Sequence, residues 1–147
     1  MVYIRNRCYD KGWFASQTFD TPVISVGNLS LGGTGKTPMT EWLIMKLSNS
    51  GKIAVLSRGY RRKTKGFRLV NPDDSVFESG DEPLQIARKF PEVTVAVDAN
   101  RVRGITHLEK EFTPGLILLD DGFQHRKVTP KYAILLTAYG KLYANDW

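Results

Sequence analysis

Five short apolar runs limit the folds open to this chain of 147 residues. They read VISV, IAVLS, VTVAV, LILLD and YAILLT, at residues 23–26, 53–57, 93–97, 116–120 and 132–137. Each run is almost continuously apolar and does not alternate apolar with polar residues, which is typical of strands buried on both faces of a parallel sheet. We therefore expect the five runs to be strands of a mainly parallel sheet.

Apolar residues at helical spacing lie between several of these runs. They are Met39, Trp42, Leu43 and Leu47 in the first such segment, Leu84, Ala87 and Phe90 in the second, and Val102, Ile105, Leu108 and Phe112 in the third. Pro38 suits the first turn of the first helix, and Asp98 is a candidate N-cap of the third. The alternation predicts an α/β fold of the phosphate-loop type, an open sheet with helices on both faces. Ligands of such sheets bind at the carboxyl ends of the strands.

A glycine-rich loop separates the first predicted strand from the first predicted helix. It reads Ser30-Leu31-Gly32-Gly33-Thr34-Gly35-Lys36-Thr37, and it matches the G-x-x-x-x-G-K-[ST] pattern except for the serine in first position. Its glycines allow successive N–H groups to point at an anion, and the helix N-terminus adds partial positive charge. We expect Lys36 to reach the β- and γ-phosphates of ATP and the Thr37 hydroxyl to ligate Mg²⁺. The alternative is a tight strand-to-helix turn with an incidental lysine.

Two aspartates, Asp120 and Asp121, stand where the fourth apolar run ends. A carboxylate at the tip of a parallel strand beside a phosphate loop is a suitable ligand for nucleotide-bound Mg²⁺. Adjacent residues of a strand point to opposite sides, so we expect one aspartate to serve the metal and the other a water or a neighbouring group. His125 follows closely and is a further candidate. The alternative is an ordinary Asp-Asp-Gly turn with a surface histidine.

A basic loop follows the second predicted strand, and its residues should lie at the same sheet edge as the glycine loop. Arg58 is a candidate for neutralising charge on a transferring phosphoryl group, although a basic loop that is merely solvated is the alternative. Asp81 and Glu82 then begin a helix in the motif GDEP. Asp81 could accept the proton of an attacking hydroxyl group, whereas both carboxylates could instead be simple partners of the helix dipole. The basic residues of the loop are Arg58, Arg61, Arg62, Lys63, Lys65 and Arg68.

The formal net charge of +6 favours anionic partners. The single cysteine excludes an intrachain disulfide and suits a reducing compartment. Residues 1–20 mix aromatic with basic side chains and predict an amphipathic segment suited to a membrane interface, with a partly buried helix as the alternative. Residues 21–147 are then the phosphate-loop nucleotide-binding domain.

Other functions of a phosphate loop are less consistent with the sequence. A GTPase would carry a guanine-reading N/T-K-x-D motif, which the sequence lacks. A nucleic-acid-binding module is disfavoured because the basic residues occupy one loop and do not follow a helix face or an aromatic-studded sheet. A non-catalytic or different phosphate-loop nucleotide-binding domain remains the alternative to an enzyme that transfers a phosphoryl group.

Five motifs together resemble one family. VISVGNLSLGGTGKTP, SRGYRRKTKGF, GDEP, VAVDANRVRGI and LLDDGFQHRKV occur in the same order as in the tetraacyldisaccharide 4'-kinases of lipid A biosynthesis. The resemblance covers nearly the whole chain. It implies transfer of the γ-phosphate of ATP to the 4'-hydroxyl of a lipid-linked glucosamine disaccharide, at the cytoplasmic face of the bacterial inner membrane.

The resemblance also implies roles for single residues. It implies that Asp81 is the catalytic aspartate, that Lys36 and Thr37 belong to the phosphate loop, and that Asp120 and Asp121 form the Mg²⁺ site. The expected partners are the lipid A disaccharide precursor and a membrane surface, and no nucleic acid. Members of the family carry an apolar membrane helix ahead of the RNRxYDKG stretch and a second domain that supplies a histidine and more of the lipid site. This chain resembles their N-terminal part, so we expect full activity to need that second domain.

Overall fold

The computed structural model describes residues 16–28, 35–120 and 126–137. Helices α2, α3, α4 and α5 span Lys36–Leu47, Val76–Ser79, Asp81–Lys89 and Arg101–Phe112, and the short 3-10 helix η1 spans Ser48–Ser50. Strands β1 to β6 span Val23–Asn28, Ile53–Ser57, Arg68–Leu69, Thr94–Val97, Leu116–Asp120 and Tyr132–Leu136. In this part of the chain no helix is both long and apolar enough to cross a membrane.

The strands form one sheet in the order β3-β4-β2-β5-β1-β6. All neighbouring pairs are parallel except β3 with β4. The five apolar runs are therefore confirmed as strands β1, β2, β4, β5 and β6 of a mainly parallel sheet. Strand β3 was not predicted, because its two residues, Arg68 and Leu69, carry no apolar run of their own and become a strand only by pairing with β4.

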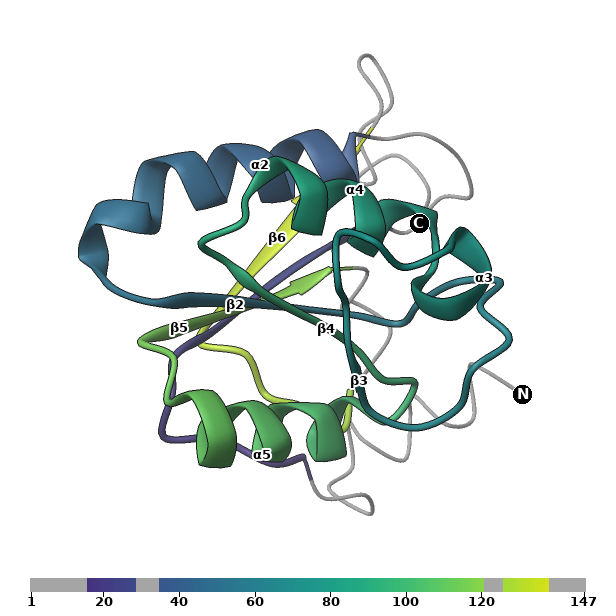
Figure 1. The fold of residues 1–147 in the computed structure, drawn as a ribbon. Coiled ribbons are helices and arrows are strands. Elements are labelled where there is room, and N and C mark those ends of the chain that lie inside the picture. The colour runs from purple at the N-terminus through teal and green to yellow at the C-terminus, as the bar shows by residue number, and fades with distance from the viewer. Residues whose placement is uncertain (1–15, 29–34, 121–125, 138–147) are drawn as a thin grey trace.

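Helices cover both faces of the sheet, as predicted (Figure 1). Helices α2 and α4 lie on one face and α5 lies on the other. Each face has its own apolar cluster: Ile44 of α2 and Ile86 of α4 pack with Val55 of β2 in the first, and Ile105 of α5 packs with Leu56 and Ile117 in the second. The order of elements thus places the beginning of α2 and the beginning of α4 on the same side of the sheet.

Strand β6 differs from the prediction that it is buried on both faces. Tyr132 is 63% exposed and Leu135 is 37% exposed. The cause is position, because β6 is an edge strand that pairs only with β1 among the described strands. Ile134 and Leu136 pack against the first apolar cluster, so this apolar run is only partly covered and lies at the border of the sheet.

Asp98 is not the N-cap of α5, which corrects the sequence-based expectation. The N-cap is Asn100, whose side-chain oxygen accepts the backbone N–H of Arg103 at 3.2 Å. Asp98 is fully buried and accepts two hydrogen bonds from the Arg103 guanidinium, at 2.8 and 2.9 Å. Burial alone would raise the pKa of Asp98, but Arg103 and the Asn100 N–H outweigh it and hold this pKa below its usual value. The ion pair between the buried Asp98 carboxylate and the half-exposed Arg103 guanidinium therefore anchors the loop between β4 and α5.

Candidate active site

Helix α2 begins directly after a glycine in the left-handed conformation. Gly35 has φ 83° and ψ 26°, and its carbonyl accepts the N–H of Met39 at 3.0 Å. A Cβ added at Gly35 would meet nothing within 4 Å, so the backbone conformation and not crowding requires glycine here. The chain thus turns sharply into the helix at Lys36. The preceding candidates Ser30, Leu31, Gly32, Gly33 and Thr34 lie outside the described residues.

The Lys36 side chain lies over the carboxyl end of β1. Its ammonium group donates to the Asn28 Oδ1 atom at 3.3 Å, and Asn28 is the last residue of β1 and is only 6% exposed. Thr37 follows in the first turn of α2 and is partly buried. Sequence reasoning missed Asn28, although a polar residue at the end of an apolar strand was the available signal.

A cleft of about 560 Å³ brings several predicted site residues together. Lys36 lines one wall, and Asp81 and Glu82 at the start of α4 line another. Arg58 is exposed and does not line this cleft. The full set of described lining residues is Lys36, Tyr60, Arg61, Val76, Asp81, Glu82 and Pro83. The structure thus unites the glycine-loop lysine with the GDEP carboxylates, as the predicted chemistry requires.

Two glycines bring the basic loop against the start of α4. Gly59 has φ 70°, and Gly80 has φ 91° and ψ 158°. A Cβ added at Gly80 would lie 3.2 Å from the Gly59 Cα and 3.2 Å from the Tyr60 carbonyl oxygen. Only a chain without side chains at these positions can approach so closely. This backbone contact explains why Tyr60 and Arg61 share the cleft with Asp81.

Glu41 connects α2 with α4. It is 8% exposed, and its carboxylate accepts from the Lys89 Nζ at 2.6 Å and from the Gln85 Nε2 at 2.9 Å. The hydrogen bond from Lys89 lowers the pKa of Glu41 despite the opposing effect of burial. Asp81, Gln85 and Lys89 recur every four residues along α4 and so share one face of it. The bridge therefore orients the helix that begins with Asp81 relative to the helix that begins with Lys36.

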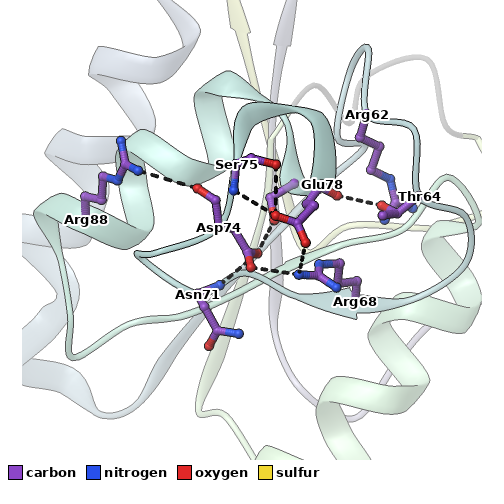
Figure 2. A network of polar contacts seen from close by, with 9 residues as sticks. Arg62, Thr64, Arg68, Asn71, Asp74, Ser75, Glu78 and Arg88 are labelled. Atoms are coloured by element: carbon purple, nitrogen blue, oxygen red, sulfur yellow. Dashed lines mark hydrogen bonds and ion pairs between the residues drawn. The ribbon is translucent and has the colours of Figure 1, made fainter.

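A polar network fixes the segment that follows the basic loop (Figure 2). Arg68 forms ion pairs with Asp74 at 2.7 Å and Glu78 at 3.4 Å. Asp74 also accepts the Asn71 N–H at 3.1 Å and the Ser79 hydroxyl. Burial would raise the pKa of Asp74, but these hydrogen bonds lower it further than burial raises it. Because Ser79 is two residues before Asp81, the network fixes the chain just ahead of the candidate base.

The same network divides the basic loop into inward and outward side chains. Arg62 donates to the Thr64 hydroxyl at 3.3 Å and to the Gly66 carbonyl at 2.5 Å. Thr64 in turn donates to the Glu78 carbonyl at 2.5 Å. Arg62 and Arg68 are thus partly buried and hold the loop in place. The remaining basic residues of the loop are exposed, namely Arg58, Arg61, Lys63 and Lys65.

Asp120 ends β5 at the same sheet edge. It is fully buried, and it is paired in register with Val26 of β1, two residues before Asn28. The buried Arg101 donates to the Asp120 carbonyl oxygen at 3.3 Å. Asp121 and His125, the other candidates in this region, lie outside the described residues.

The oxygen donors of this edge fit Mg²⁺. The carboxylate of Asp120 and the hydroxyl of Thr37 are the hard ligands that this ion prefers. No cluster of three carboxylate, imidazole or thiol groups occurs within residues 16–28, 35–120 and 126–137. Such a cluster is not needed, because Mg²⁺ in nucleotide sites keeps several waters and takes its other ligands from phosphates.

Comparisons with known proteins give a consistent result. The profile of the family described as tetraacyldisaccharide-1-P 4'-kinase matches residues 1–147. The tetraacyldisaccharide 4'-kinase of Flavobacterium johnsoniae is 56% identical over 98% of this chain and 43% of that protein. Its counterpart from Phocaeicola vulgatus is 52% identical over 99% of this chain and 40% of that protein. The chain thus spans about two fifths of the length of these relatives.

A solved structure shares the fold. It is described as the "apo" form of LpxK from Aquifex aeolicus in complex with ATP. It is 40% identical to this chain, has a TM-score of 0.84, and the match covers 91% of this chain and 44% of that one. The α/β architecture predicted from the sequence is therefore the architecture of an ATP-bound relative.

Proposed function

Because this chain belongs to the tetraacyldisaccharide-1-P 4'-kinase family, we propose that it is the nucleotide-binding part of an ATP-dependent lipid kinase. The acceptor is the 4'-hydroxyl of the tetraacyl glucosamine disaccharide 1-phosphate of lipid A biosynthesis. The place of action is the cytoplasmic face of the bacterial inner membrane. The relatives' names and the ATP in the related structure support this reaction.

One observation carries the proposal most directly, namely that a single cleft is lined by Lys36 and Asp81. In-line phosphoryl transfer needs a cation at the phosphates and a group that accepts the hydroxyl proton of the acceptor. Lys36 serves the first need at the start of α2, where the helix N-terminus adds positive charge. Asp81 serves the second from the start of α4, and Glu82 beside it contributes to the orientation of the acceptor.

The metal and charge requirements are assigned to the neighbouring residues. Asp120 and Thr37 would hold Mg²⁺, and Asp121 is the further candidate. When bound, the ion neutralises the phosphate oxygens during transfer. Among the arginines, Arg61 lines the cleft with a left-handed φ of 61°, whereas Arg58 does not line it. Backbone conformations of this kind cluster at functional sites, and we therefore favour Arg61 over Arg58 for stabilising the transferred group.

Equilibrium binding of Mg-ATP and Mg-GTP to this chain tests the nucleotide site. We expect a preference for ATP and a large loss of affinity in Lys36→Ala. Lys46→Ala is the matched control, because Lys46 is an exposed lysine in the last turn of the same helix. Equal ATP affinity in the Lys36 and Lys46 variants would contradict the phosphate-loop assignment.

Turnover of the lipid acceptor by the full-length protein tests the catalytic assignment. Asp81→Asn should reduce turnover by roughly 10²–10⁴-fold, as loss of a general base does, while ATP binding is retained. The control is Asp73→Asn, an exposed carboxylate in the turn before α3. Near-normal turnover in Asp81→Asn would remove Asp81 from this role. ATP binding without any turnover in the full-length protein would favour the alternative, a non-catalytic nucleotide-binding domain.

A further inference from the structure

Apolar side chains at the mouth of the cleft have no role in the proposed phosphoryl transfer. Tyr60 is 70% exposed, Val76 is 46% exposed and Phe77 is 62% exposed. Tyr60 and Val76 line the cleft itself, and Phe77 follows Val76 in α3. We call these three residues the apolar rim. Large apolar side chains that gather beside a cleft are typical of an interaction surface.

The apolar rim is held in place although it is exposed. The Lys63 N–H donates to the Phe77 carbonyl oxygen at 2.7 Å, and the Thr64 hydroxyl donates to the Glu78 carbonyl at 2.5 Å. These bonds fasten the basic loop alongside α3. The two segments therefore present one continuous surface, and its side chains need little further ordering when they meet a partner.

Exposed cations accompany each aromatic ring of the rim. The Arg61 guanidinium lies 5.2 Å from the centre of the Tyr60 ring, and the Lys63 ammonium lies 4.7 Å from the centre of the Phe77 ring. Lys65 is a third exposed cation in the same loop. Rings paired with cationic heads suit the headgroup region of a bilayer, where the ring enters the apolar boundary and the cation remains among the phosphates.

We propose that the apolar rim, with the exposed Lys63 and Lys65 of the basic loop, docks on an anionic lipid bilayer and opens the cleft toward the membrane surface. This proposal rests on the proposed function only for the nature of the acceptor, which carries acyl chains. The charge of the loop matches the anionic surface. The exposed Val76 can enter the acyl boundary together with the Tyr60 and Phe77 rings.

Co-sedimentation with vesicles tests the proposal in this chain. The vesicles are phosphatidylcholine with or without phosphatidylglycerol. Phe77→Ser should lower the partition coefficient on anionic vesicles about tenfold, because burial of a phenyl ring in the bilayer is lost. Met45→Ser is the matched control, since Met45 is 55% exposed and lies nine residues along α2 from Lys36, about 14 Å away along the helix axis. Lys63→Gln should weaken binding only where phosphatidylglycerol is present.

A fluorophore attached at position 77 reports the contact directly. Phe77→Cys and Met45→Cys, each with Cys8→Ser, are labelled with an environment-sensitive dye. On anionic vesicles we expect a blue shift at position 77 and none at position 45. Equal shifts at both positions, no shift at position 77, or unchanged sedimentation of Phe77→Ser would overturn the proposal, as would binding of RNA in place of vesicles. ATP binding by the same variants separates the docking proposal from the proposed nucleotide site. A chain that binds ATP but does not contact the vesicles would refute the docking surface and leave the nucleotide site standing.

Discussion

The contact between Gly80 and the Gly59–Tyr60 backbone allows a quantitative test of how the cleft is built. In Gly80→Ala, the residue must keep φ 91° and ψ 158°, a region that costs a residue with a side chain about 1–3 kcal/mol. Its Cβ would also lie 3.2 Å from the Gly59 Cα and the Tyr60 oxygen. These atoms are backbone and cannot rotate away, so overpacking adds about 1–3 kcal/mol. The expected loss of unfolding free energy is therefore roughly 2–6 kcal/mol.

Substitutions at two other glycines separate the contribution of backbone strain from that of overpacking. Gly35→Ala imposes a left-handed φ with no neighbour within 4 Å, and should cost about 1–2 kcal/mol. Gly115→Ala meets only the Lys52 carbonyl oxygen at 3.7 Å, an ordinary contact, and should change stability by about 0.5 kcal/mol or less.

Urea unfolding followed by circular dichroism measures all three variants. The midpoint of Gly80→Ala should fall by roughly 1–3 M, with the slope of the transition unchanged. If Gly80→Ala is no less stable than Gly35→Ala, the backbone contact does not hold the basic loop against α4, and the reasoning fails.

Two ion pairs give further predictions. Lys89→Met should lower the free energy of unfolding by about 1–2 kcal/mol, because Glu41 stays buried without its ammonium partner. Lys46→Met, at an exposed position on α2, is the control. Equal urea midpoints for the two variants would contradict the role of the Glu41–Lys89 ion pair. Asp98 has a lowered pKa in the folded state, so its ionised form stabilises the fold at every pH above the unfolded-state pKa of about 3.9. This contribution is lost as the pH falls below that value and through the lower pKa of the folded state. Urea midpoints between about pH 7 and pH 3 should therefore fall less steeply in Asp98→Asn than in the parent chain, and parallel curves would show that the Arg103 ion pair contributes nothing.

The sheet could be predicted from the sequence because buried parallel strands require continuous apolar runs, and five such runs are present. The glycine loop and GDEP were recognisable because their chemistry depends on residues close together in the chain. Glu41 was not recognisable, because a glutamate on a helix is normally solvated and its partner Lys89 is 48 residues away. Strand β3 and the two-sided burial expected for β6 were misjudged for a related reason. Pairing and position in a sheet depend on contacts that are distant in sequence.

The sequence also does not predict which side chains of the basic loop turn inward and which remain exposed. Six cations between positions 58 and 68 are equivalent by composition, yet Arg62 and Arg68 bind internal oxygens while Lys63 and Lys65 remain exposed. Only the carbonyl groups and carboxylates supplied by the folded segment around α3 decide which arginine turns inward. The structure is therefore needed to assign a structural or a functional role to each basic residue of the loop.

The position of β1 in the sheet affects the order in which the molecule can fold. Within the described part of the chain, β1 pairs only with β5 and β6, whose residues follow it by about ninety positions or more. Contacts this distant along the chain form slowly, since a long segment must first be closed into a loop. During synthesis on the ribosome, β1 and the glycine loop behind it must wait for strands made much later. The nucleotide site therefore depends on strands that emerge about ninety residues after β1, and a folding unit without β5 cannot contain it.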